Sequence, residues 1–266
     1  MSVVTFLTDF GLQDDFVGTC HGVIARIAPD ARVIDVTHGI APQAVLQGAL
    51  VLHSTIGYMP VGVHLAVVDP GVGGERRAVA VRTADSRLFV GPDNGLLTQA
   101  VETLGIDAVH ELVDTRYRLP EVSRTFHARD VFAPAAAHLA NGVPIEELGP
   151  ALEPAGLVRI EVPAPDVGRT QISAVVLAVD RFGNVATNAR RAHVDALGLA
   201  DGDRVEIRLA LDRYYAVVAR TFADAPPGEL ILYEDSYAFM TLAISRGNAA
   251  RLTRVAPGDE LRVAVT

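Results

Sequence analysis

The pattern of predicted secondary structure changes once along this chain, and that change constrains the fold more than any single motif. In the first part, apolar strand segments such as Val63–Val68 alternate with helical segments such as Phe16–Ile27. Beyond Leu157–Gly168, which contains two prolines and a glycine, short strands separated by Asp-Gly and Pro-Gly turns dominate. We therefore predict an α/β domain with a mainly parallel sheet (residues 1–162), followed by a small all-β domain, a barrel or a sandwich (residues 168–266).

Acidic residues follow two of the predicted strands at the point where each strand ends. Asp9 follows the strand Val3–Thr8, and Asp69 follows Val63–Val68. In open α/β sheets, ligands bind outside the carboxyl ends of the strands, so we expect both carboxylates at a binding crevice. Turn formation is the competing interpretation, because aspartate is also a common turn residue.

The connection after Val63–Val68 reads DPGVGGER and leads into another predicted strand, Ala78–Arg82. It is not a phosphate-binding loop, because it lacks a final Gly-Lys-Ser/Thr, and Arg76 stands where a dinucleotide fingerprint needs its third glycine. Its proline and glycines require a sharp turn. Residue types leave two interpretations open: a site that uses Asp69 and Arg76, or a tight β-connection in which Asp69 caps the turn and Arg76 is solvated.

A histidine stands in the segment Thr125–Asp130, directly before the predicted helix Val131–Ala140. At the entrance of a helix His127 could act as a general base, although a hydrogen-bonded structural histidine is the commoner case. We expect the adjacent Arg129 and Asp130 to pair with each other or to cap the helix.

Two loops of the second domain combine polar, aromatic and small residues. Asp180–Asn184 places an acid, a phenylalanine and an amide on one turn, and Ser245–Ala250 carries a further amide. Such groups can bind an ammonium group and a flat ring. Because aspartate, glycine and asparagine are also the residues that turns prefer, the turn interpretation stays open for both loops.

Composition excludes several classes of function. All 23 basic residues are arginine, so Schiff-base chemistry on lysine is impossible. The single cysteine, Cys20, excludes an intramolecular disulfide and a cysteine-based zinc cluster. A formal net charge of −9 without a basic cluster argues against a nucleic-acid partner. We find neither a long apolar run nor a signal peptide, so we expect a soluble cytoplasmic protein with no membrane segment.

Six motifs in order resemble the S-adenosylmethionine (SAM) hydroxide adenosyltransferases, which are relatives of the fluorinase and chlorinase enzymes. The motifs are TDFG (8–11), VDPGVG (68–73), PDNG (92–95), TFHARD (125–130), FGN with TN (182–188) and GNAA (247–250). The resemblance implies an α/β domain, a C-terminal β-barrel, and a homotrimer whose active sites lie between the N-terminal domain of one subunit and the C-terminal domain of its neighbour. The implied reaction converts SAM and water into adenosine and L-methionine by attack at the ribose C5′.

The resemblance also implies roles for individual residues. Its catalytic set maps onto Asp69, Arg76 and His127, with the histidine taking the proton of water, the aspartate orienting the base or the water, and the arginine favouring hydroxide. Its substrate-binding set maps onto Asp9 (ribose hydroxyls), Asp180, Asn184 and Ser236 (methionine), Phe182 and Phe222 (adenosyl group), Asn248 and Ala249 (adenine edge), and Tyr237. The leaving thioether is neutral, so no general acid is needed. Neither a metal nor a cofactor is implied.

Two alternatives accompany the hydrolase hypothesis: a chloride-using halogenase and a non-catalytic sensor of adenosine or SAM. The halogenating relatives have a tyrosine in place of His127, no match to Asp69, and an extra loop in the N-terminal domain. Gln43, Ala128 and Tyr237 stand where those relatives carry tryptophan, serine and arginine. These differences from the halogenating relatives favour hydrolysis. Ala128 also departs from the glycine of the hydrolytic members, and this departure does not favour hydrolysis.

Overall fold

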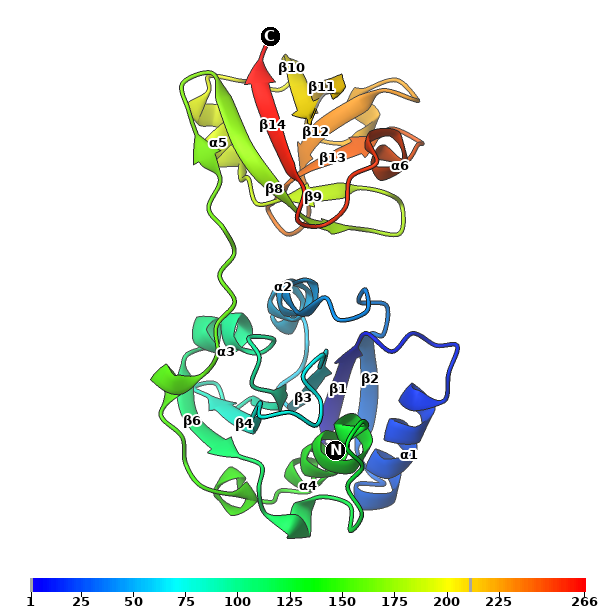
Figure 1. Cartoon of the computed structure of the whole chain (residues 1–266), viewed down its shortest axis with the longest axis vertical. Helices are drawn as coiled ribbons and strands as arrows, with labels where there is room; N and C mark the ends of the chain where they lie inside the picture. The colour runs from blue at the N-terminus through cyan, green and yellow to red at the C-terminus, as the bar shows by residue number, and fades with distance from the viewer. Residues whose placement is uncertain (1, 211) are drawn as a thin grey trace. The chain divides into compact units, whose positions relative to one another are not determined.

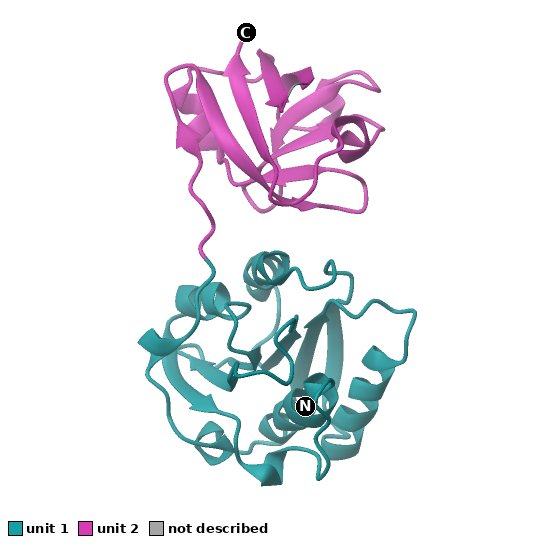
Figure 2. Ribbon diagram, in the orientation of Figure 1, with its two compact units in different colours: residues 1–160 teal, residues 161–266 magenta. Residues whose placement is uncertain are grey.

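The computed structural model describes residues 2–210 and 212–266 and divides into two compact units, Met1–Ile160 and Glu161–Thr266 (Figure 2). Met1 and Leu211, which the predicted domains include, lie outside the described residues. Each unit has its own sheet and its own hydrophobic core. Across the residues described, no helix has the length and apolar character that crossing a bilayer requires.

The described part of the first unit contains a six-stranded sheet in the order β2-β1-β3-β5-β4-β6 (Figure 1). The pairs β1–β2, β1–β3 and β3–β5 are parallel, whereas β4 runs antiparallel to β5 and β6. The prediction of a mainly parallel sheet is therefore confirmed. The strands are β1 (Val3–Thr8), β2 (Arg32–Thr37), β3 (Val63–Val67), β4 (Ala78–Thr83), β5 (Leu88–Pro92) and β6 (Ile106–Glu111).

Helices cover both faces of this sheet. Successive side chains of a strand point to opposite faces, so Phe6 of β1 packs in the core that includes α1 and α4, and Leu7 packs in the core that includes α2 and α3. A sheet covered on both faces needs continuously apolar strands, and all five residues of β3 are buried as predicted. The helices are α1 (Phe16–Ile27), α2 (Val45–Ile56), α3 (Thr98–Leu104) and α4 (Ala133–Ala140), with short turns η1 (Thr115–Tyr117), η3 (Ile145–Leu148) and η4 (Pro154–Gly156).

The helix predicted for Val131–Ala140 begins earlier than expected. A π-helical turn, η2 (Ala128–Phe132), precedes α4, and His127 is its N-terminal flanking residue. The expected pair between Arg129 and Asp130 forms, with 2.6 Å between Nε and Oδ1. Such π-turns are rare and frequently occur at functional sites.

In its described residues the second unit forms a closed β-barrel, which decides between the barrel and the sandwich. Its strand order is β14-β10-β11-β12-β13-β9-β8-β7, and a further pairing of β14 with β8 closes the ring. The strands are β7 (Asp166–Val167), β8 (Gln171–Val179), β9 (Val185–Thr187), β10 (Arg204–Leu209), β11 (Asp212–Ala219), β12 (Leu230–Glu234), β13 (Met240–Ile244) and β14 (Glu260–Val265). The helical segments are α5 (Arg191–Ala196), η5 (Phe222–Asp224) and α6 (Ala249–Thr253).

Candidate active site

The loop after β3 carries Asp69 and turns sharply. The backbone N–H of Val72 donates to the carbonyl oxygen of Asp69 over 3.2 Å. Gly73 has a φ of 76°, and a Cβ atom at this position would collide with the backbone carbonyl oxygen of Arg124. This close approach brings the glycine-rich loop against the segment that leads to His127.

The three residues expected to be catalytic lie together. The Nε atom of Arg76 donates to both carboxylate oxygens of Asp69 at 3.0 Å, and its Nη2 atom donates to Oδ2 at 2.6 Å. The same Nη2 atom lies 2.8 Å from Nδ1 of His127, a residue 51 positions later in the chain. The side chain of Arg76 is only 11% exposed, so the alternative with a solvated arginine does not describe this loop.

The neighbouring Arg77 has a different environment. Its guanidinium pairs with Asp93, with 2.9 Å between Nε and Oδ2, and its Nη2 donates to the carbonyl oxygen of Gly156. Just before β4, the two adjacent arginines thus have different partners, Asp69 for Arg76 and Asp93 for Arg77. The sequence assigned Arg76, rather than Arg77, to the site only through the spacing of the resembling family. The different partners of the two arginines supply a physical reason for this assignment.

The contact with Arg76 determines which nitrogen of His127 carries the proton. A guanidinium can only donate, so Nδ1 must accept, and a neutral imidazole then carries its proton on Nε2. Burial and the positive charge of Arg76 lower the pKa of His127 below its usual value of 6.5, and the nearby Asp69 opposes this shift. His127 is therefore neutral near pH 7 and presents an N–H donor at Nε2.

Asp69 and His127 both line a cavity of about 360 Å³ in the first unit, together with Asp9 and Gln43. Sequence reasoning missed its aromatic wall, which is formed by Phe10, Phe16 and Phe126, with ring centroids 5.2–6.1 Å apart. Phe10 and Phe126 belong to the motifs TDFG and TFHARD, which were the available signal. A small, partly apolar cavity with convergent polar groups is typical of a small-molecule site.

Asp9 forms a hydrogen bond with the backbone of the loop that carries Gln43. Its Oδ2 atom accepts a hydrogen bond of 2.7 Å from the backbone N–H of Gln43, which has a φ of 66°. The carboxylate keeps unused lone pairs, so it can still accept hydrogen bonds from hydroxyl groups. Ala128, the residue that departs from both groups of relatives, also lines this cavity.

In the second unit, the predicted residues Asp180, Phe182 and Asn184 lie on one tight loop. The Asp180 carboxylate accepts from the backbone N–H groups of Phe182 and Asn184 at 2.8 and 2.9 Å, and from the Asn184 side chain at 2.7 Å. The Phe182 ring is 68% exposed. Asp180 thus has the turn-forming role that the sequence left open, and the exposed ring retains a surface for a ligand.

The two loops of the second unit that were predicted from motifs pack against each other. Gly183 has a φ of 84°, and a Cβ there would collide with the side chain of Asn248. The N–H of Ala250 donates to the Gly183 carbonyl oxygen at 2.9 Å, and Asn248 caps α6 by accepting from the N–H of Arg251 at 2.7 Å. Ala249 is fully buried, so only its backbone is a candidate for ligand contact.

Phe222, Ser236 and Tyr237 are exposed in the second unit. The Phe222 ring packs 4.9 Å from the ring of Tyr233, a residue that sequence reasoning missed. Burial, reinforced by the carboxylates of Asp235 and Asp180, raises the pKa of Tyr233 to about 12. Tyr233 therefore packs against the Phe222 ring and carries a neutral hydroxyl at physiological pH.

Comparison with known proteins identifies the family. The N-terminal domain model of the SAM hydroxide adenosyltransferases matches residues 4–149, and the C-terminal domain model matches residues 174–262. The (R)-S-adenosyl-L-methionine hydrolase of Salinispora arenicola is 49% identical over 98% of this chain and 97% of its own length. The chain belongs to the SAM hydroxide adenosyltransferase family.

More distant matches agree with this placement. A protein of Actinoplanes sp. named fluorinase is 30% identical over 91% of this chain and 90% of its own length. A crystal structure described as an uncharacterized conserved protein from Thermotoga maritima aligns with a TM-score of 0.90 and 36% identity, covering 98% of this chain and 99% of that one. The fold is therefore shared over 98% of this chain.

Proposed function

We propose that this protein hydrolyses SAM to adenosine and L-methionine. The observation that carries the proposal is the 49% identity, over nearly the whole of both chains, to a protein named (R)-S-adenosyl-L-methionine hydrolase. That name specifies one configuration at the sulfonium, so we also propose that the (R) epimer is the preferred substrate. The halogenase alternative is less well supported, because the fluorinase relatives are only about 30% identical.

The reaction needs a positioned water molecule and a place for its proton. The water oxygen attacks the ribose C5′ and forms the new C–O bond, while the C5′–S bond breaks and its electron pair returns to sulfur. The sulfonium becomes the neutral thioether of methionine, and the attacking water loses one proton. Catalysis therefore concentrates on the water, and exclusion of solvent helps because opposite charges cancel along the path.

The geometry of Asp69, His127 and Arg76 supports a division of roles. Asp69 is a carboxylate on the cavity wall whose oxygens keep free lone pairs, so we propose that it accepts the proton of the attacking water. His127 then donates its Nε2–H to the water oxygen, instead of accepting the proton as the family resemblance suggested. Arg76 touches both partners and is the positioning residue.

This assignment gives a pH dependence with a definite sign. Because the pKa of His127 is lowered and only the neutral form accepts from Arg76, activity should fall as pH drops through a midpoint below 6.5. His127→Gln keeps a side-chain N–H donor that does not titrate, so we expect residual activity without this acid inflection. Steady-state kcat measured between about pH 5 and pH 8 tests both statements. A glutamine variant with no turnover at any pH would favour the histidine as the base.

The residues of the second unit fit the proposal if they complete the site of a neighbouring subunit. The first unit has the cavity with Asp9, Asp69 and His127, and the second unit exposes Phe182 and Phe222 on loops of its own. We propose a homotrimer with sites between subunits. Light scattering after size-exclusion chromatography should give the mass of three chains, and a monomer with full activity would exclude this arrangement.

The product assay separates the candidate functions. Incubation with SAM in buffer containing concentrated chloride should release equimolar adenosine and methionine, as measured by chromatography. Accumulation of 5′-chloro-5′-deoxyadenosine would establish the halogenase alternative. Saturable binding of SAM with no product from well-folded protein would establish the sensor.

A further inference from the structure

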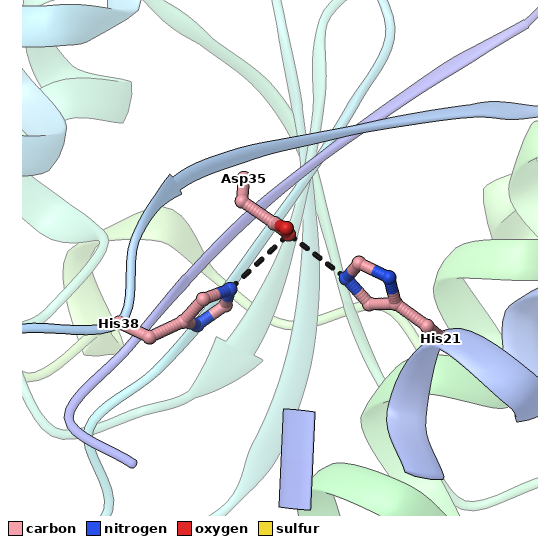
Figure 3. Close-up of side chains that lie close together, drawn as sticks. All are labelled: His21, Asp35 and His38. Atoms are coloured by element: carbon pink, nitrogen blue, oxygen red, sulfur yellow. Dashed lines mark hydrogen bonds and ion pairs between the residues drawn. The ribbon is translucent and has the colours of Figure 1, made fainter. Parts of the chain in front are cut away.

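A cluster of two histidines and one aspartate lies in the first unit, on elements that do not supply the three catalytic candidates. His21 is on α1, Asp35 is on β2, and His38 follows directly after β2; Figure 3 shows both imidazoles turned toward the one carboxylate. Oδ1 of Asp35 is 2.8 Å from Nε2 of His21 and 3.1 Å from Nε2 of His38. One ligand atom from each residue lies within 4.8 Å of the others.

His38 is the residue that points to a ligand. Its side chain is 3% exposed, and its Nε2 is one of two buried side-chain nitrogens without a hydrogen-bond partner in the described residues. Although Nε2 is 3.1 Å from Asp35, the two atoms are not aligned for a hydrogen bond. A buried imidazole nitrogen that faces a carboxylate without such a bond requires an explanation.

The other ring nitrogen of His38, Nδ1, already has a hydrogen-bond partner. Nδ1 lies 2.8 Å from Oγ1 of Thr8, which also accepts from the N–H of Phe10 at 3.2 Å. A histidine that binds a metal characteristically donates its second ring N–H to an oxygen atom, which fixes the ring and leaves the other nitrogen free for the metal. Donation from Nδ1 to Thr8 produces this state and directs the Nε2 lone pair at the cluster.

We propose that His21, Asp35 and His38 bind a divalent transition-metal ion of the zinc class. An ion about 2.0–2.1 Å from each ligand atom separates them by about 3.3 Å in a tetrahedral site, so the observed separations need only small side-chain shifts. Two imidazoles and one carboxylate suit Zn²⁺ better than Mg²⁺ or Ca²⁺, which prefer oxygen ligands. The side chains of His21 and Asp35 are 35% and 42% exposed, which leaves water access to a fourth position.

The role of this ion is to hold elements together, and no step of the proposed hydrolysis passes through it. The ion links α1 to β2 and to the residue after β2. The carbonyl oxygen of His38 in turn accepts a 2.8 Å hydrogen bond from the N–H of Gly11, and Thr8 directly precedes Asp9. The site therefore lies outside the cavity and stabilises the loop that carries Asp9.

Titration of the full-length protein with Zn²⁺ after treatment with a chelator tests the proposal. Calorimetry should find one ion bound per chain, and His21→Ala and Asp35→Asn should each weaken binding by at least about tenfold, the loss that even an outer partner of a metal ligand causes. His53→Ala removes a histidine on α2 outside the cluster and should bind Zn²⁺ like the wild type. Zn²⁺ should also raise the unfolding temperature of the wild type and of His53→Ala, and it should raise that of Asp35→Asn by less at the same Zn²⁺ concentration.

Two results would overturn the proposal. The first is wild-type protein that takes up no Zn²⁺. The second is undiminished binding by both His21→Ala and Asp35→Asn, which would place the ion elsewhere. Neither result bears on SAM hydrolysis, which is assayed separately by adenosine release.

Discussion

Arg76→Lys should lower kcat for adenosine release by about 10²-fold or more, comparable to the loss of a preorganised donor from an active site. The guanidinium uses Nε and Nη2 to hold Asp69 and the same Nη2 to hold Nδ1 of His127. Lysine keeps the charge but presents it at one point, so it cannot maintain the bidentate pair and the histidine contact together. Both Asp69 and His127 would lose their orientation toward the water.

Arg77→Lys is the matched control because it changes the adjacent arginine in the same way. Arg77 also forms a close pair with an aspartate, but this aspartate, Asp93, does not line the cavity, whereas Asp69 does. We expect its kcat to remain close to that of the wild type. Steady-state kinetics gives the kcat of both variants, and circular dichroism checks that both are folded. Equal losses of kcat in the two variants would contradict the proposed role of Arg76.

Acidification should destabilise the first unit through His64, a residue of β3 that the proposed chemistry does not use. Its ring is fully buried, with Nδ1 2.9 Å from Oγ1 of Thr5, and burial lowers its pKa to about 3. The unfolded chain binds a proton near pH 6.5, whereas the folded chain resists protonation until about pH 3. Stability is therefore fully present above pH 6.5 and is lost as pH falls toward 3.

The magnitude follows from the shift: the slope reaches about 1.4 kcal/mol for each pH unit well below pH 6.5, which gives about 2 kcal/mol between pH 6.5 and pH 4.5. His64→Gln keeps a hydrogen-bonding group but does not titrate here, so the stability difference between wild type and variant should shrink by this amount on acidification. Hydrogen exchange of peptides from β3 reports the local opening free energy. A difference that is constant with pH would show that His64 is not held neutral by the fold.

The sequence predicted the two-part architecture well because periodicity follows directly from burial. The continuous apolar run of β3 and the 3.6-residue period of α1 both reflect which faces meet a core, and both elements form where expected. The π-turn before α4 was not predicted, because it depends on how residues 128–132 pack and leaves no periodic signal. The closure of the barrel by β8 and β14 likewise depends on a pairing between distant segments.

The candidate site shows the same limit. Motifs named Asp69, Arg76 and His127, but only the fold shows that one guanidinium contacts both Asp69 and His127, the latter 51 residues further along the chain. That contact also changes the chemistry expected of His127, because a histidine's tautomer depends on its neighbour and not on its own identity. The cluster of His21, Asp35 and His38 was not predicted from the sequence, because its members come from separate elements and match no motif.

The most direct test of the proposed hydrolysis uses separated (R) and (S) epimers of SAM in water labelled with heavy oxygen, followed by mass spectrometry of the products. We predict that the (R) epimer yields methionine without label and adenosine with the label in its 5′ hydroxyl group, because water oxygen forms the new bond to C5′. Adenosine without label, or no adenosine from either epimer, would contradict the proposed hydrolysis.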